Sequence, residues 1–231
     1  MPTLLITGAS TGIGAATAKQ AVEAGWDVAL SARSEDKLRA LADELGSDHT
    51  HVVPCDVTEW DDQQRLVSET IDRFGGIDAA FANAGFGAKR GFLEEEPDFW
   101  RSMVLTNVLG PALTIRAVLP HFLERDAGHF LITSSVAGRR ALPGSLYSAT
   151  KFATTAIGEA LRAELRQMHE NHAIRVTLIE PGMTDTPFFD TSPGEHALRD
   201  DDIANAVIYA LEQPPQVDVN EILIRPASQP T

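Results

Sequence analysis

The sequence predicts an α/β fold, in which a mostly parallel sheet carries helices on both faces. Short apolar, β-branched runs of strand length alternate with longer helical patterns along the whole chain. A glycine-rich turn directly follows the first apolar run, and small or polar residues follow the later ones. The 231 residues contain no linker and no internal repeat, so one domain spanning residues 1–231 is expected.

About seven strands are expected, and they fall at residues 2–7, 27–32, 50–54, 77–82, 129–133, 173–180 and 221–225. The predicted helices are 15–24, 35–45, 59–74, 98–124, 147–167 and 200–212. Residues 187–198 are expected to form a flap over the substrate, and the tail at 227–231 is expected to fray.

The composition excludes several classes of function. The formal net charge of −14 argues against a nucleic-acid or membrane partner, because Lys and Arg must supply the binding to either. One cysteine and seven histidines without ligand spacing predict neither a disulfide framework nor a metal site. The N-terminus has no basic stretch followed by a long apolar one, so we expect no signal peptide and a cytoplasmic protein.

The glycine-rich turn runs from Gly8 through Gly12 to Gly14, between a strand and an alanine-rich helix. Glycines let backbone N–H groups approach a pyrophosphate, and the helix dipole favours its charge. Because this turn stands at the first strand–helix junction, it predicts a Rossmann-type, doubly wound dinucleotide-binding fold.

The end of the second strand bears on the choice of cofactor. A carboxylate there suits the ribose of NAD, whereas an arginine suits the 2′-phosphate of NADP. This chain has Ala32 followed by Arg33, flanked by serines, and no carboxylate. NADP(H) is therefore favoured and NAD(H) remains possible, with the alternative that Arg33 merely opens a solvated helix.

Three later strand ends also carry residues suited to a ligand. Asp56 and Val57 can hold an adenine, although Asp56 could equally cap the next helix. The turn Asn83-Ala84-Gly85 lets the backbone approach a ligand, and the Asn83 amide can bridge neighbouring strands. Pro181 and Gly182 turn the chain sharply and offer backbone groups.

A break is expected within the helix predicted at 98–124. Asn107 precedes Gly110-Pro111, and a proline at 111 disturbs the hydrogen bond to the carbonyl of Asn107. Such departures from local rules are expected at functional sites.

The pair Ser134-Ser135 and the helical residues Tyr147 and Lys151 carry the predicted chemistry. Tyr147 and Lys151 are four residues apart, so they project from one face of a helix. A nearby ammonium favours the phenolate and lowers a tyrosine pKa that is ordinarily about 10. A serine hydroxyl can hold a carbonyl or alcohol oxygen. The alternative for an isolated Tyr-x-x-x-Lys is packing and a solvated lysine.

Taken together, these motifs resemble the short-chain dehydrogenase/reductase family, in its compact single-domain branch. The resemblance covers essentially the whole chain and rests on seven motifs in order: Thr7–Gly14, Asp56-Val57, Asn83–Gly85, Asn107–Gly110, Ser134–Gly138, Tyr147–Lys151 and Pro181-Gly182.

The resemblance implies a catalytic tetrad of Asn, Ser, Tyr and Lys. Tyr147 would be the general acid and base, and Lys151 would lower its pKa and bind the nicotinamide ribose. The carbonyl of Asn107 would hold a water that passes protons to Lys151. The cofactor would also contact Gly8, Ser10, Thr11, Ile13, Arg33, Asp56, Val57, Asn83, Thr184 and Thr186.

The catalytic serine is ambiguous between two neighbours. Ser134 has the family's usual spacing to the tyrosine, whereas Ser135 matches the local motif that leads into Val136-Ala-Gly138. We choose Ser135 and place the missing residue in the loop 139–146, because loops tolerate deletions.

These motifs predict an NADP-dependent oxidoreductase that interconverts a carbonyl and a secondary alcohol. The alternatives are an NAD-preferring hydroxy-acid or alcohol dehydrogenase of the same family, a nucleotide-sugar epimerase or dehydratase, and a non-catalytic NADP sensor. The resemblance also implies a homotetramer or homodimer, formed through the two long helices. The substrate would be a small apolar or mixed ketone, or a 3-hydroxy acid, lying against Ser134, Phe86, Leu142, Pro143, Phe188 and Phe189.

Overall fold

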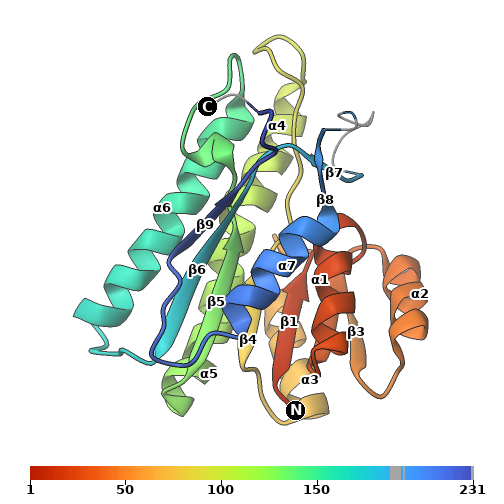
Figure 1. Cartoon of the computed structure of the whole chain (residues 1–231), viewed down its shortest axis with the longest axis vertical. Helices are drawn as coiled ribbons and strands as arrows, with labels where there is room; N and C mark the ends of the chain where they lie inside the picture. Colours follow the sequence, from red (N-terminus) through yellow and green to blue (C-terminus); the bar gives the residue numbers. More distant parts are fainter. Residues whose placement is uncertain (188–193, 195, 230–231) are drawn as a thin grey trace.

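In the computed structural model, which describes residues 1–187, 194 and 196–229, seven parallel strands form one sheet (Figure 1). The strand order is β3-β2-β1-β4-β5-β6-β9. The strands are β1 (Thr3–Thr7), β2 (Asp27–Ala32), β3 (Thr50–Pro54), β4 (Ala79–Ala82), β5 (Gly128–Thr133), β6 (Ile174–Pro181) and β9 (Glu221–Ile224).

Helices cover both faces of the sheet, and the short helix α4 (Pro97–Val104) leads through one further turn into α5 (Gly110–Arg125). The other long helices are α1 (Gly12–Glu23), α2 (Glu35–Leu45), α3 (Trp60–Phe74), α6 (Leu146–Gln167) and α7 (Asp200–Leu211). The hydrophobic core has two clusters, one on each face of the sheet. Helices α1, α2 and α7 contribute to one cluster, and α3, α5 and α6 contribute to the other. The predicted fold class is confirmed.

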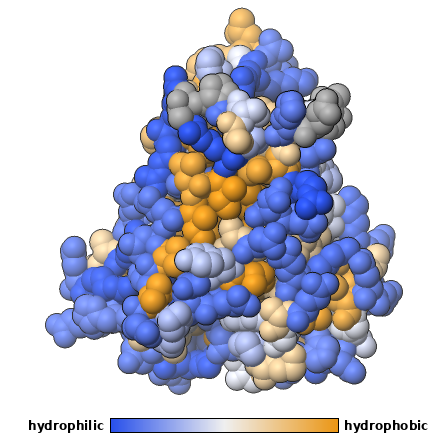
Figure 2. Space-filling view, in the orientation of Figure 1, coloured by the Kyte–Doolittle hydropathy of each residue, from blue (hydrophilic) through white to orange (hydrophobic). Residues whose placement is uncertain are grey.

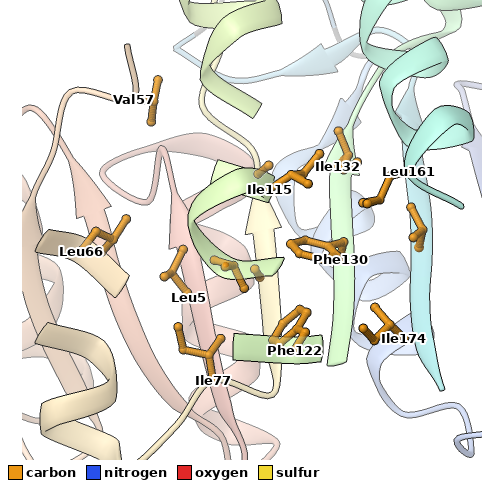
Figure 3. Close-up of a cluster of buried hydrophobic side chains, with 14 of the residues drawn as sticks. Leu5, Val57, Leu66, Ile77, Ile115, Phe122, Phe130, Ile132, Leu161 and Ile174 are labelled. Atoms are coloured by element: carbon orange, nitrogen blue, oxygen red, sulfur yellow. The ribbon is translucent and has the colours of Figure 1, made fainter. Parts of the chain in front are cut away.

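The strands supply both clusters because successive side chains point to opposite faces. On β5, Phe130 and Ile132 belong to the α3–α5–α6 cluster, and Leu131 belongs to the other (Figure 3). The rings of Phe122 and Phe130 meet with centroids 4.7 Å apart. Continuous apolar runs are thus explained by burial on both faces of a parallel sheet.

The helix predicted at 98–124 is one helical stretch from Pro97 to Arg125, interrupted where the break was expected. Its middle turn, Leu105–Leu109, is a π-helix, which joins α4 to α5. By length and composition alone, Pro97–Arg125 could cross a membrane. Core helices pass the same test, and α5 places Ile115, Val118 and Phe122 in the core.

The order of the strands in the sheet determines where a ligand-binding crevice can form. From β1 the chain winds outward to β3, and then returns to the other side of β1 as β4. Loops at the carboxyl ends of β1 and β4 therefore diverge, and a crevice opens between them. A small ribbon of β7 (Thr184–Asp185) and β8 (Leu198–Arg199) stands beside the crevice (Figure 1). The predicted flap at 187–198 follows β7, and its Phe188 and Phe189 lie outside the described residues.

Candidate active site

A cavity is lined by residues at the carboxyl ends of the strands. In Figure 1 these strand ends point toward the top of the picture. The cavity brings together residues from strand ends that lie far apart in the sequence. The predicted cofactor residues that line it are Gly8, Ser10, Thr11, Gly12, Ile13, Arg33, Asp56, Val57, Asn83, Ala84, Gly85, Tyr147, Lys151, Pro181, Gly182, Thr184 and Thr186. The predicted substrate residues Phe86, Ser134 and Leu142 line it as well.

The glycine-rich turn has the backbone that a phosphate cradle requires. Gly8 has a φ of 69°, and a Cβ there would lie 2.8 Å from the Cα of Ala84. Gly14 does not line the cavity. It lies beneath the turn, where a Cβ would come within 2.2 Å of the carbonyl oxygen of Gly8. The requirement at position 14 is thus close packing, which lets α1 begin at Gly12 and face the cavity with its N-terminus.

The cofactor end of the cavity carries one arginine and one carboxylate. Arg33 is exposed and lines the cavity together with Ala32 and Ser34. Asp56 also lines it, and its Oδ1 accepts hydrogen bonds from the N–H and hydroxyl of Thr58 at 3.0 and 2.8 Å. Asp56 therefore organises the turn before α3 but does not cap that helix, whose N-cap residue is Glu59. The side chain of Asp56 faces the cavity, and its contact with an adenine stays a prediction.

Asn83 joins three neighbouring strands at the centre of the cavity. Its Nδ2 donates to the carbonyl oxygens of Thr7 and Gly8, both at 3.3 Å. Its Oδ1 accepts from the hydroxyl of Thr133 at 3.0 Å. The predicted bridging role is confirmed, and it fixes the crevice between β1 and β4.

Ser135 lies beside Tyr147. Its Oγ forms a hydrogen bond with the Tyr147 side chain, donates to the carbonyl oxygen of Pro181 at 3.3 Å, and accepts from the N–H of Ala137 at 3.0 Å. The last contact caps the 3₁₀ turn Val136–Gly138. This hydroxyl is therefore held by the turn that follows it and directed at the phenol.

Ser134 has a different environment, although it also lines the cavity. Its Oγ bonds to the hydroxyl of Thr155 at 2.7 Å and donates to the carbonyl of Lys151 at 3.1 Å. Both contacts tie the end of β5 to α6. The structure thus places Ser135, the chosen serine, against Tyr147, and Ser134 in a supporting network.

Burial controls the ionisation of Tyr147 and Lys151. Burial raises the pKa of Tyr147 to about 12, and the hydrogen bond between Ser135 and Tyr147 opposes this rise. Burial lowers the pKa of Lys151 to about 8, although its Nζ donates to the carbonyl of Thr133 at 2.8 Å. The Nζ lies 5.7 Å from the centroid of the Tyr147 ring. The expected lowering of the Tyr147 pKa is not found here, because desolvation of the phenol is the largest effect on it.

Asn107 is buried in the π-turn and does not line the cavity. Its side chain accepts from the N–H of Phe86 at 3.0 Å and donates to the carbonyl of Phe86 at 2.8 Å. Its backbone carbonyl accepts from the hydroxyl of Thr154 at 3.0 Å. The side chain of Asn107 thus holds the backbone of Phe86, which does line the cavity, and the carbonyl of Asn107 joins the π-turn to α6.

Sequence reasoning missed several residues that line the cavity. Arg90 adds a positive charge to its wall, and Met183 adds an apolar side chain. Gln229 also lines the cavity, and its Oε1 accepts from the N–H of Met183 at 2.9 Å. The tail is thus held as far as Gln229, contrary to the expected fraying of residues 227–229. Nothing local to Gln229 signals this contact with a loop 46 residues away.

Known proteins are similar to this chain in both sequence and fold. A sequence model described as short chain dehydrogenase matches residues 2–196. An uncharacterized oxidoreductase of Staphylococcus haemolyticus is 41% identical over 225 residues, which cover 96% of each chain. The alcohol dehydrogenase of the archaeon Thermococcus sibiricus, complexed with 5-hydroxy-NADP, is 31% identical, with a TM-score of 0.90 over 100% of this chain and 99% of that one. The closed form of a serine dehydrogenase complexed with NADP⁺ is 28% identical, with a TM-score of 0.92 over 99% and 96% of the two chains.

The fold, together with the similarity to known dehydrogenases in sequence and structure, defines an oxidoreductase that acts on CH–OH donors and binds a nicotinamide cofactor. The chain belongs to the short-chain dehydrogenase/reductase family.

Proposed function

We propose that the protein interconverts a carbonyl and a secondary alcohol with NADP(H), using Asn107, Ser135, Tyr147 and Lys151. The observation that carries this proposal is the hydrogen bond between Ser135 and Tyr147, in the cavity that also contains the glycine-rich turn. The turn, the N-terminus of α1 and the adenine-side residues fit a dinucleotide phosphate and its base. When bound, the nicotinamide supplies or accepts a hydride.

Tyr147 is the general acid in carbonyl reduction. With a pKa raised to about 12, its phenol is protonated at neutral pH and can donate to the developing alkoxide. Ser135 holds the same oxygen with its hydroxyl and keeps it beside the phenol. In alcohol oxidation Tyr147 acts instead as the general base, which requires its phenolate form. Because the pKa of Tyr147 is high, we expect oxidation to be faster in alkaline solution.

Lys151 holds positive charge at the site. With a pKa lowered to about 8, it is mostly charged at neutral pH and stabilises negative charge on the phenol after proton transfer. We propose that Asn107 acts through its side chain and its backbone carbonyl. The side chain fixes Phe86, and the carbonyl, already bonded to Thr154, holds a water on its second lone pair to return protons to Lys151.

Arg33 makes NADP(H) the favoured cofactor. It is the charged side chain at the end of β2, and the cavity wall beside it offers Ser34 rather than a carboxylate. A guanidinium binds a phosphate in a bidentate fashion and retains its charge at every physiological pH. The NADP-complexed structures of the alcohol and serine dehydrogenases support the same choice. An NAD-preferring dehydrogenase is the alternative, and the relative affinities for NADPH and NADH decide between them.

The substrate end favours a small carbonyl compound with an apolar body and an anionic group. Phe86, Leu142 and Met183 supply the apolar wall, and Arg90 supplies the positive charge. This combination suits a 3-oxo acid or the corresponding 3-hydroxy acid. Comparison of a 3-oxo acid with its methyl ester tests the charge. Arg90→Gln should reduce kcat/KM for the acid by about fivefold and leave the ester unchanged.

Turnover of NADPH tests the proposed reaction. Wild-type protein should oxidise NADPH in the presence of at least one member of a panel of ketones, aldehydes and 3-oxo acids. Tyr147→Phe should lose about 100-fold or more in kcat. Tyr209→Phe is the matched control, because Tyr209 is the second of the two tyrosines and is exposed on α7. Tight NADPH binding with no turnover on any carbonyl would favour the sensor alternative.

We further propose a homo-oligomer that uses the two long helices. Val104, Leu105 and Leu109 are partly exposed on the α4–α5 stretch, and Phe152 is partly exposed on α6. Figure 2 shows a hydrophobic patch on the face that carries β9 and α7. Leu223, on β9, is half exposed. Light scattering after size exclusion should give a multiple of 25.0 kDa, and Leu105→Glu combined with Phe152→Glu should lower it. A wild-type monomer would refute this assembly.

A further inference from the structure

Three charged side chains meet just outside the cavity lining, and the predicted motifs do not account for their interactions. The Nε of Arg139 lies 2.8 and 3.0 Å from the two carboxylate oxygens of Glu180. The Nη2 of the same guanidinium lies 2.5 Å from Oε2 of Glu221. The Glu180 side chain is only 1% exposed, whereas Arg139 and Glu221 are about one-third exposed, at 33% and 39%.

Arg139 is attached directly to the turn that carries Ser135. The 3₁₀ turn Val136–Gly138 separates the two residues, and the N–H of Arg139 donates to the carbonyl of Val136 at 3.1 Å. The turn cannot shift freely, because a Cβ on Gly138 would lie 2.8 Å from the carbonyl oxygen of Lys151. A shift of the Arg139 guanidinium should therefore also shift Ser135, because one tight turn joins the two residues.

Glu180 is attached to the other contact of Ser135. It precedes Pro181, whose carbonyl accepts the hydrogen bond from the Ser135 hydroxyl at 3.3 Å. Glu221 begins β9, which binds the same segment through the N–H of Gly182 and the carbonyl of Ile224, at 2.6 Å. The charged cluster therefore connects both segments that hold Ser135 to the last strand of the sheet.

We propose that Arg139 and Glu180 are positioning residues, whose ion pair holds the Ser135 turn against the Pro181 segment so that the hydroxyl reaches Tyr147. This role rests on the proposed function, because it concerns the geometry of Ser135 and Tyr147 in hydride transfer. The guanidinium offers its donors in a rigid plane, so contact with two carboxylates fixes direction as well as distance. An apolar contact would fill the same space without fixing direction.

A purely structural ion pair predicts a different result, and the chain offers a control for it. Arg166 and Asp218 form a second partly buried pair, 3.1 Å apart, which joins α6 to the segment before β9. Glu180→Gln keeps the shape of its side chain and removes the charge, and Asp218→Asn does the same in the control pair. Both variants should lower Tm, since each weakens a partly buried pair.

The distinguishing measurement separates kcat from cofactor binding. Glu180→Gln should lower kcat for carbonyl reduction about tenfold or more and leave the Kd for NADPH within about twofold. Asp218→Asn should leave both quantities within about twofold. Equal kcat values for Glu180→Gln and Asp218→Asn, at temperatures equally far below each Tm, would overturn the positioning role.

A double variant separates stability from geometry. Arg139→Met with Glu180→Met replaces the pair by apolar side chains, which often restores stability that a single substitution removes. Its Tm should exceed that of Arg139→Met while kcat stays low. Recovery of kcat together with Tm would overturn the proposal, and if the double variant does not fold, Glu180→Gln decides. Wild-type protein without turnover on any carbonyl would instead refute the proposed function, and the positioning role with it.

Discussion

Substitution of the two neighbouring serines one at a time gives the sharpest prediction from the site geometry. Ser135→Ala removes the hydroxyl that bonds to Tyr147, to the carbonyl of Pro181 and to the N–H of Ala137. Ser134→Ala removes a hydroxyl that bonds to Thr155 and to the carbonyl of Lys151. The two changes delete the same atom type one residue apart, so each is the control for the other.

The expected magnitudes differ because the two hydroxyls face different partners. Loss of a donor aimed at the reacting oxygen costs about 100-fold or more in kcat, so this loss is expected for Ser135→Ala. Ser134→Ala loses neutral hydrogen bonds in a buried network, which costs about 1–2 kcal/mol of folding free energy. In a chain of this length that cost lowers Tm by about 2–8 °C. Its kcat should stay within about threefold of the wild type, because neither lost bond involves Tyr147.

The assay is NADPH oxidation at saturating carbonyl substrate, with Tm measured on the same preparations. A Ser135→Ala protein that keeps near-wild-type turnover, beside a Ser134→Ala protein that loses it, would reverse the assignment. It would also show that the contact between Ser135 and Tyr147 does not serve the chemistry.

Three further predictions concern the cofactor and pH. Arg33→Ala should raise the Kd for NADPH about tenfold or more without changing the Kd for NADH, whereas Lys37→Ala, on the exposed part of α2, should change neither. A direct titration that finds NADH bound tenfold more tightly than NADPH by the wild type would contradict this. Because the lowered pKa of Lys151 is about 8, kcat/KM for NADPH should fall above that pH as the ammonium loses its proton. Lys151→Arg should lack this falling limb, since its side chain remains charged, and an unchanged limb would assign it to another group. Burial lowers the pKa of His129 to about 3, so the unfolded chain binds a proton below about pH 6.5 that the folded chain does not. The free energy of unfolding should therefore drop by about 1.5 kcal/mol more between pH 6.5 and 5 in the wild type than in His129→Gln, and parallel denaturation curves would contradict it.

Much of the fold could be predicted from the sequence because it depends on local patterns. The apolar runs define the strands to within two residues, as at β5 and β6, because both faces of a parallel sheet are buried. The break at Asn107 was also predictable, since the Gly-Pro that follows conflicts with an ordinary helix. That it is a π-turn whose Asn107 side chain holds Phe86 depends on a contact between distant segments.

The parts of the site that the sequence could not predict also depend on contacts between residues far apart in the chain. Spacing favoured Ser134 and the local motif favoured Ser135, and only the folded turn shows which hydroxyl faces Tyr147. The pKa of Tyr147 depends on burial and on the hydrogen bond with Ser135, whereas helical spacing reports only that Tyr147 and Lys151 lie on one face of a helix. Arg139, Glu180 and Glu221 come together from three separate segments, so no local pattern signals their cluster.

Transfer of a labelled hydride tests the central claim most directly. NADPH that carries deuterium in place of both C4 hydrogens of the nicotinamide would be mixed with the best carbonyl substrate, and the alcohol product analysed by mass spectrometry. We predict that wild-type protein places deuterium on the carbinol carbon, and that Tyr147→Phe does so about 100-fold or more slowly while Tyr209→Phe matches the wild type. An unlabelled alcohol, or a Tyr147→Phe protein that transfers deuterium at the wild-type rate, would contradict it.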